Sequence, residues 1–405
     1  MMRSFPTYLS HDPARMSDLR RTARRTHGFS ESVIREMTRV AREHDAVNLA
    51  QGFPDFPAPT ELKEAACRAI RDDVNQYAIT WGTENLRAAL ERKYARWYGM
   101  EVEGTREITV TCGATEAMAA VMLALVDPGE EVIVLEPFYE NYGPDAVLSQ
   151  ATPVFLPLEP PNYRLDPDRL RSLVTPRTRA IVINTPNNPT GRVFDREELE
   201  GVAEICREHD ILAITDEIYE HILYEGEHIP LACMEGMRDR TVVISGASKT
   251  FSVTGWRIGT ILAPAALTDA IRKVHDFLTV GAPAPLQEAV AVGMDELDDS
   301  YYEEMVEGYR ARRQALVPAL QEAGFACAEP QGAYYVLADF SALSDEDDTT
   351  FSKRLAREAG VAPVPGSSFF SVPERGHDLI RFVFCKRLET LKEAGERLRD
   401  FAGRG

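Results

Sequence analysis

One lysine stands among small residues in the run S-G-A-S-K-T-F-S-V-T-G-W-R-I-G, residues 245–259. Serine, alanine and glycine remove side-chain bulk around Lys249, so a flat ligand could approach the backbone closely. An amine held in a partly desolvated pocket has a lowered pKa and can form a Schiff base with a carbonyl cofactor. Arg257 could then hold a phosphate of that cofactor. Taken alone, the run is more typical of a surface lysine in a loop after a strand at 241–245, and only the further stretches described below favour the chemical role.

Two charged residues occur in runs whose hydrophobicity predicts burial. Asp216 follows the apolar run 211–215, where an unpaired carboxylate would be costly, so it either pairs with a ligand cation or caps or bridges within the sheet. Arg381 lies between Ile380 and Phe382, and a guanidinium there needs an anion. A substrate carboxylate fits this guanidinium through two hydrogen bonds, and an internal acidic residue is the alternative partner.

A third candidate site is the junction C-G-A-T-E, residues 112–116, between a short apolar run and a helical pattern. Small residues there leave backbone N–H groups free at a helix N-terminus, and the helix dipole attracts anions. The junction and Arg257 together predict a phosphate site that includes Gly113, Ala114 and Thr115.

The elements that must position these residues are short apolar runs separated by amphipathic helical patterns. Runs rich in valine and isoleucine are typical of a parallel sheet covered by helices on both faces. Such sheets bind ligands beyond the carboxyl ends of their strands, where nearly every candidate lies. We expect an α/β fold with strands at 108–112, 132–135, 180–183, 211–215 and 242–244, and helices at 115–126, 142–150 and 196–209.

The chain has 405 residues, more than one hydrophobic core usually organises, so two domains are expected. Strand patterns at 332–337 and 379–384, with helices at 350–359 and 389–401, indicate a smaller α+β domain. We predict an N-terminal arm at 1–29, a segment at 30–56 that begins with a helix at 30–44 and packs with the small domain, a large cofactor-binding domain at 57–296, and a small C-terminal domain at 297–405.

Composition excludes several classes of function. The 45 lysines and arginines face 64 aspartates and glutamates, a formal charge of −19, which disfavours nucleic acid as a partner. The six cysteines lie far apart without metal-ligand spacing, which predicts reduced thiols in a cytoplasmic protein and no metal site. No apolar run is long enough to span a membrane, and Asp12 and Asp18 argue against a transit segment in the arginine-rich N-terminus.

Several runs together resemble the class I and II pyridoxal-phosphate (PLP) aminotransferases of fold type I. They are the lysine run 245–259, N-T-P-N-N-P-T-G at 184–191, T-D-E-I-Y at 215–219 and I-R-F-V-F at 380–384, in the family's order and spacing. The runs N-L-A-Q-G-F-P-D-F at 48–56 and E-P-F-Y at 136–139 are similar to the branch that holds kynurenine aminotransferases, glutamine transaminases and bacterial methionine aminotransferases.

The resemblance implies a role for each candidate residue. Lys249 would bind the cofactor aldehyde and act as general acid and base, and Asp216 would pair with the pyridine nitrogen. Tyr219 and Asn188 would bond the phenolic oxygen of the ring. The other implied cofactor contacts are Phe138, stacked on the ring, Asn184, the phosphate ligands Gly113, Ala114, Thr115, Ser248 and Arg257, and Tyr77 from the other subunit of a homodimer; Gly52, Asn188 and Arg381 would contact the substrate.

The chain departs from the family pattern in two places. Gly246 stands where many members carry a phosphate-binding serine, so Ser245 or Ser248 must substitute or the phosphate site has one donor fewer. Animal kynurenine and glutamine enzymes close aromatic residues and a histidine over the substrate, whereas this chain has Ile34 and the small residues near 280–281. Specificity for aromatic substrates is therefore not implied.

We predict a cytoplasmic, homodimeric, PLP-dependent aminotransferase that moves an amino group between an L-amino acid and a 2-oxo acid in a ping-pong cycle. A PLP-dependent C–S β-lyase of cysteine conjugates would share the cofactor contacts. A non-catalytic PLP-sensing module would need a DNA-binding domain ahead of the homologous region. No lysine or arginine falls among the residues expected on the substrate side, which are Ile34, Phe53, Tyr77 and residues 280–282, so donors with neutral side chains should outrank aspartate.

Overall fold

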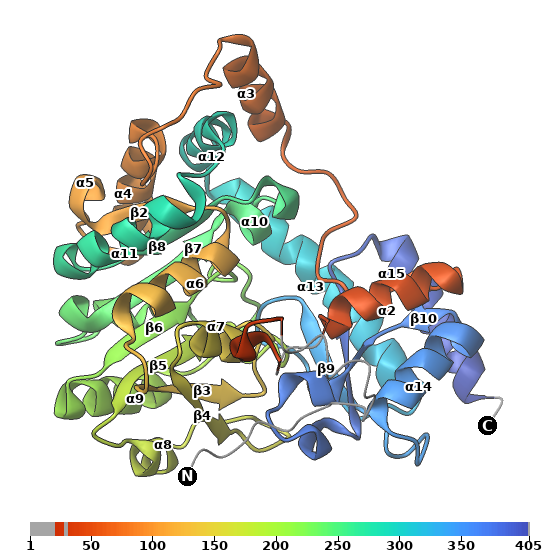
Figure 1. Cartoon of the computed structure of the whole chain (residues 1–405). Coiled ribbons are helices and arrows are strands. Elements are labelled where there is room, and N and C mark those ends of the chain that lie inside the picture. Colours follow the sequence, from red (N-terminus) through yellow and green to blue (C-terminus); the bar gives the residue numbers. More distant parts are fainter. Residues whose placement is uncertain (1–20, 28–30, 404–405) are drawn as a thin grey trace.

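The computed structural model describes residues 21–27 and 31–403, so most of the predicted N-terminal arm lies outside the described residues. Figure 1 shows a broad α/β body joined to a smaller group of elements from the C-terminal part of the chain. The elements of the first half are α2 (Val33–Glu43), β1 (Val47–Asn48), α3 (Thr60–Arg71), α4 (Glu84–Tyr98), α5 (Gly104–Glu107), β2 (Ile108–Thr111), α6 (Ala114–Leu125), β3 (Glu131–Glu136), α7 (Tyr142–Leu148), β4 (Thr152–Pro157), α8 (Pro167–Leu173), β5 (Thr178–Asn184) and α9 (Arg196–His209).

The second half completes the body and adds the smaller group. Its elements are β6 (Leu212–Asp216), β7 (Thr241–Gly246), α10 (Ala247–Thr250), β8 (Gly259–Leu262), α11 (Ala265–Thr279), α12 (Ala284–Glu296), α13 (Asp299–Glu322), β9 (Tyr335–Asp339), α14 (Asp348–Arg354), a π-helical turn (Leu355–Ala359), β10 (Val361–Ala362), β11 (Val364–Pro365), β12 (Leu379–Val383) and α15 (Leu388–Ala402). Among the described helices, none has both the length and the apolarity that crossing a membrane requires.

The large sheet has seven strands in the described part of the chain, in the order β2-β8-β7-β6-β5-β3-β4. Its neighbours pair in parallel except at β8, which runs antiparallel to β2 and β7. The predicted mostly parallel sheet is confirmed, although the sequence patterns missed β4 and β8. β4 contains two prolines, which are tolerated because it is an edge strand, where a missing N–H does not interrupt the hydrogen bonds between strands. β8 has only four residues, which is a short pattern to recognise.

Alternate residues of the central strands enter two different hydrophobic cores. Ile133 and Ile181 pack with α9, whereas Val134 and Val182 pack with α6 and α7. Helices therefore cover both faces of the sheet, which explains why its central strands are apolar at consecutive positions.

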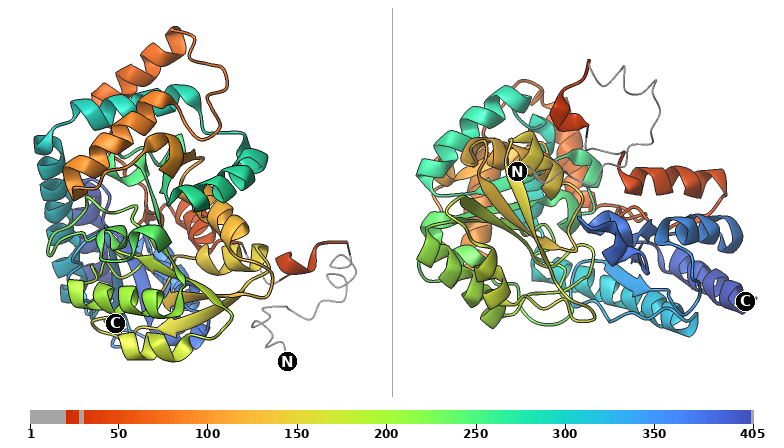
Figure 2. Two further views of the ribbon diagram at one scale, coloured as in Figure 1. Left: turned by 90° about the vertical axis from the view of Figure 1, so that its left-hand side faces the viewer. Right: turned by 60° about the horizontal axis from the view of Figure 1, so that its bottom comes forward.

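The smaller group is built around an antiparallel sheet in the order β11-β12-β9. The helix α13 runs from the large body into this group, where α15 packs against it (Figure 1). The N-terminal segment joins the same group, because β1 pairs in parallel with β10 and α2 contacts β10 and β11. In the right-hand view of Figure 2, the blue C-terminal elements lie together on one side of the large sheet.

The carboxyl ends of neighbouring parallel strands meet at the edge of the large sheet nearest to the smaller group. Asn184 ends β5, Asp216 ends β6, and Lys249 lies in α10, directly after β7. The order of these strands therefore brings together residues that are far apart in the sequence.

Candidate active site

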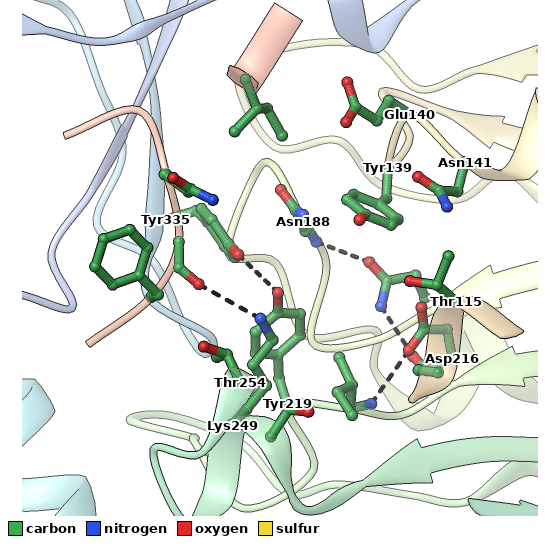
Figure 3. Close-up of a pocket in the computed structure, with 18 of the residues that line it drawn as sticks. Thr115, Tyr139, Glu140, Asn141, Asn188, Asp216, Tyr219, Lys249, Thr254 and Tyr335 are labelled. Atoms are coloured by element: carbon green, nitrogen blue, oxygen red, sulfur yellow. Dashed lines mark hydrogen bonds between the residues drawn. The ribbon is translucent and has the colours of Figure 1, made fainter. Parts of the chain in front are cut away.

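A cavity of about 450 Å³ lies where the large sheet, the N-terminal segment and the smaller group meet (Figure 3). Eleven of the residues predicted from the sequence line it, from all three parts of the chain. They are Gly52, Ala114, Thr115, Asn184, Asn188, Asp216, Tyr219, Ser248, Lys249, Arg257 and Arg381.

Lys249 is half-buried in the wall of this cavity. Its Nζ donates a hydrogen bond of 3.4 Å to the Gly52 carbonyl oxygen and lies 5.8 Å from the ring centroids of Tyr219 and Tyr334. Burial lowers the pKa of the Lys249 ammonium to about 8. The uncharged form of the amine, which can act as a nucleophile, is therefore more abundant near neutral pH than it is for an ordinary lysine.

Asp216 is buried, and its carboxylate faces the cavity. The Tyr142 hydroxyl donates to its Oδ2 at 2.7 Å, and the Ile218 N–H donates to its Oδ1 at 3.3 Å. Burial raises the pKa of Asp216 despite these two donors. A cation placed against this carboxylate would remove that cost, which is the chemistry that a protonated ring nitrogen provides.

A chain of hydrogen bonds connects Asp216 to Arg381. Asn184 donates from Nδ2 to the Asp216 backbone oxygen at 2.9 Å and accepts the Asn188 N–H at 2.8 Å (Figure 3). Arg381 donates from Nη1 to Asn188 Oδ1 at 2.9 Å and from Nη2 to the Ala50 carbonyl oxygen at 2.6 Å. This series of hydrogen bonds fixes the positions of the Asn184 and Asn188 side chains.

The Arg381 guanidinium is buried, and no acidic residue pairs with it in the described ranges. Its Nε is buried without a hydrogen-bond partner. The alternative expected from the sequence, an internal acidic partner for Arg381, is therefore not observed among the described residues. An unsatisfied guanidinium nitrogen beside a cavity fits a carboxylate ligand.

The end of the cavity at which the sequence predicted a phosphate site is formed by the N-terminus of α6 and by Arg257. Gly113 is the N-cap of α6, with φ +82° and no side-chain cap, so the first N–H groups of the helix are not taken by a capping side chain. Gly113 does not line the cavity itself. A Cβ at this position would overlap the Arg257 guanidinium, so glycine is what lets the arginine lie there.

The two serines that could replace the usual phosphate ligand lie in different surroundings. The Ser245 hydroxyl donates to buried Glu220, whereas Ser248 lines the cavity. Gly246 between them pairs with Gly259 of β8, and a Cβ there would lie 2.6 Å from the Ile258 carbonyl oxygen. The close approach of the two strands therefore excludes a serine at this position.

Phe138 does not line the cavity, contrary to expectation. It is buried in the core beside α6, stacked on Phe155 at 5.4 Å between ring centroids. The next residue, Tyr139, lines the cavity instead, across from Lys249 in Figure 3. The sequence prediction was wrong by one position, because successive residues of this segment face opposite sides.

The other residues expected near the substrate differ in position. Tyr77, which the resemblance assigns to the site of the other subunit, has 88% of its surface exposed and does not line the cavity of the single chain; residues 280–282 do not line it either. Ile34 and Phe53 do line it. Arg35 of α2 also lines it, and this arginine was not among the residues that the sequence placed on the substrate side.

Sequence reasoning missed two tyrosines that support the site. The Tyr335 hydroxyl lies 2.7 Å from that of Tyr219, and a Cβ at Gly52 would overlap it. Tyr142 bonds Asp216. Tyr335 occurs in the strand pattern at 332–337 and Tyr142 in a helical pattern, and neither pattern indicates what the hydroxyl contacts.

The residues present fit PLP. A half-buried amine, a buried carboxylate, a helix N-terminus beside an arginine, and an arginine with an unpartnered nitrogen meet in one cavity. No group of three or more histidine, cysteine or acidic side chains that could hold a metal ion occurs within the described ranges. The large sheet and this site together define a PLP enzyme of fold type I.

Comparisons with known proteins give the family. The model of the family "Aminotransferase class I and II" matches residues 44–398. The chain is similar to the probable N-succinyldiaminopimelate aminotransferase of Mycobacterium tuberculosis, with 41% identity over 95% of this chain and 99% of that one. The solved structure of that aminotransferase has a TM-score of 0.91, covering 94% of this chain and 99% of the other.

Two further relatives carry other names. Methionine aminotransferase of Escherichia coli is 38% identical over 91% of this chain and 95% of its own length. Human kynurenine–oxoglutarate transaminase 1 is 37% identical over 93% of this chain and 97% of its own. The chain belongs to the class I and II aminotransferase family and is a PLP-dependent transaminase, as the sequence motifs predicted.

Proposed function

We propose that the residues lining the cavity have the following roles in the aminotransferase reaction. Lys249 would hold the cofactor through its amine and, when that amine is free, would take up and return the proton at the substrate Cα. Asp216 would pair with the ring nitrogen, and Tyr219 and Asn188 would bond the phenolic oxygen. The observation that carries these roles is the convergence of Lys249, Asp216 and Arg381 on one cavity.

The other residues hold the ligands in place. When bound, PLP supplies an aldehyde that exchanges with amino groups and a ring that accepts electrons from the substrate Cα. The phosphate would lie against the N–H groups of Ala114 and Thr115, the Ser248 hydroxyl and Arg257. Arg381 would bind the α-carboxylate through its free Nε and one Nη, while Asn188 holds the guanidinium plane.

We also propose a homodimer with shared active sites, in a cytoplasmic protein of amino-acid metabolism. Two exposed apolar segments lie side by side, because His275 on α11 donates to the Thr80 carbonyl oxygen at 2.8 Å. Their exposed residues include Tyr77 and also Phe277, which is 91% exposed. Such a patch favours burial against a second copy. The cysteines, which are free and widely spaced, support the proposed cytoplasmic location.

Mixing two variants tests whether Tyr77 serves the partner's site. Lys249→Ala and Tyr77→Phe chains, unfolded and refolded together, should form heterodimers in which one site has both an intact lysine and an intact tyrosine. Activity per Lys249-containing chain should then exceed that of Tyr77→Phe homodimers. No gain over the Tyr77→Phe homodimer would mean that Tyr77 serves its own subunit, and a monomer in sedimentation analysis would contradict the dimer itself.

Substrate choice is tested by kcat/KM for the common amino acids with several 2-oxo acids. The cavity lining includes Ile34, Phe53 and Tyr139, which suit uncharged side chains. We expect methionine, glutamine, leucine or phenylalanine to outrank aspartate, because the short aspartate side chain would hold its carboxylate among such residues without a cation of its own. The acceptor is a neutral 2-oxo acid or 2-oxoglutarate. Aspartate as the best donor would contradict the proposal, and pyruvate released from cysteine conjugates without an acceptor would indicate a β-lyase.

A further inference from the structure

Arg35 is a cationic residue that lines the cavity, and the proposed mechanism gives it no role. It lies in the first turn of α2, is exposed, and lines the cavity beside Ile34. Within the described residues its guanidinium forms no hydrogen bond and no ion pair, although its charge is one of the causes that lower the pKa of the exposed Glu31 carboxylate. Its neighbours on α2 do form ion pairs. Arg39, one turn further along α2, pairs with Glu31, and Glu36 pairs with Lys353 at 2.8 Å.

The other cations of the cavity are already assigned. Four lysine and arginine side chains line it in the part of the chain that the structure describes. Lys249 and Arg257 face the cofactor and Arg381 the α-carboxylate, which leaves Arg35 for another anionic group. The acidic lining residues are Asp216 and Glu140, and Glu140 accepts a hydrogen bond of 2.6 Å from the Ser32 hydroxyl.

Arg35 and Arg381 differ in depth. Arg381 is buried in β12, whereas Arg35 is exposed on α2. Figure 3 shows the end of this helix near Glu140 and Tyr139, away from Lys249. A ligand whose α-carboxylate binds Arg381 can place a second carboxylate at Arg35 only if its side chain is long enough to reach the exposed part of the lining.

We propose that Arg35 is a specificity-determining residue that selects substrates with a long side chain ending in a carboxylate. The proposal rests on the aminotransferase function proposed above and refines it: long 2-aminodicarboxylates and the matching oxo acids join the neutral donors, while aspartate remains poor. A guanidinium at an exposed rim binds a carboxylate through charge-assisted hydrogen bonds that solvent partly screens. Glu140 opposes this attraction from its own side of the rim.

The test compares amino donors whose side chains differ in length, and its readout is a ratio of kcat/KM values. We would measure kcat/KM for aspartate, glutamate, 2-aminoadipate and 2-aminopimelate, each relative to norleucine, in the wild type, Arg35→Gln, Arg35→Lys and the control Arg39→Gln. In Arg35→Gln the ratio for 2-aminopimelate should fall about five- to tenfold, mainly through KM. Arg35→Lys should keep most of the ratio, and the control should leave it unchanged.

Binding of inert dicarboxylates gives a second readout without turnover. Pimelate should bind the PLP-loaded wild type more tightly than Arg35→Gln in a spectral titration, and added salt should reduce the difference because the pair is exposed. Glu140→Gln should raise the 2-aminopimelate ratio. An unchanged ratio in Arg35→Gln would overturn the inference, as would an equal fall in Arg39→Gln. A wild type that transaminates no amino acid at all would instead overturn the proposed function.

Discussion

Replacing Lys249 by alanine is expected to lower kcat by roughly 10²- to 10⁴-fold or more, because the same amine holds the cofactor and moves the Cα proton. The variant should still bind PLP, since the phosphate site, Asp216 and the ring contacts remain. Borohydride reduction of the wild type, followed by peptide mapping, should place the pyridoxyl label on Lys249. A label on another lysine would contradict the mechanism. Lys392→Ala, which removes an exposed lysine of α15, is the matched control.

The pH dependence of cofactor capture tests the same amine. Burial lowers the pKa of Lys249 to about 8, so its uncharged form becomes dominant above that pH. The rate at which apoenzyme captures PLP should therefore rise from pH 7 to about pH 8 and level off above it, as expected for attack by the free amine. A rate that keeps rising to pH 10 would show that the lysine keeps an ordinary pKa.

The sequence predicted the elements and site residues that depend on local pattern. The helix α9 was predicted with its observed bounds, and the structure shows a capping box formed by Asp195 and Glu198 at its start. Lys249 was found from the small residues around it and Asp216 from the apolar run before it, whereas Asn184 came from the resemblance to the aminotransferase family. Signals of this kind lie within a single segment of the sequence, so they can be recognised without knowing which other elements pack against that segment.

The missed residues depend on packing between distant segments. Phe138 and Tyr139 are both aromatic, and only the position of Phe155 and the core beside α6 decides which of them is buried. Tyr335 reaches Tyr219 across a sequence separation of 116 residues. Arg35 is one of several arginines on an exposed helix face, and only the docking of α2 beside the cavity distinguishes it from Arg39.

Replacing Asp216 by asparagine is expected to lower kcat by orders of magnitude, because an uncharged amide cannot stabilise a protonated ring nitrogen. The burial that raises the pKa of the Asp216 carboxylate also strengthens its attraction to a cation, so the loss should be large. A fall smaller than about tenfold, or 1.4 kcal/mol of activation free energy, would mean that the ring nitrogen pairs elsewhere.

Two companion variants separate this charge effect from damage to the fold. Asp145→Asn removes another buried carboxylate, on α7, whose pKa burial raises to about 7 and whose Oδ2 has no hydrogen-bond partner. Asp145 does not line the cavity, so this change should cost far less activity than Asp216→Asn. Tyr142→Phe removes the hydroxyl that donates to Asp216 at 2.7 Å but keeps the charge, so its activity should fall between the two. Equal losses in Asp145→Asn and Asp216→Asn would assign the effect to packing near α7, whereas the expected order requires a negative charge at the end of β6.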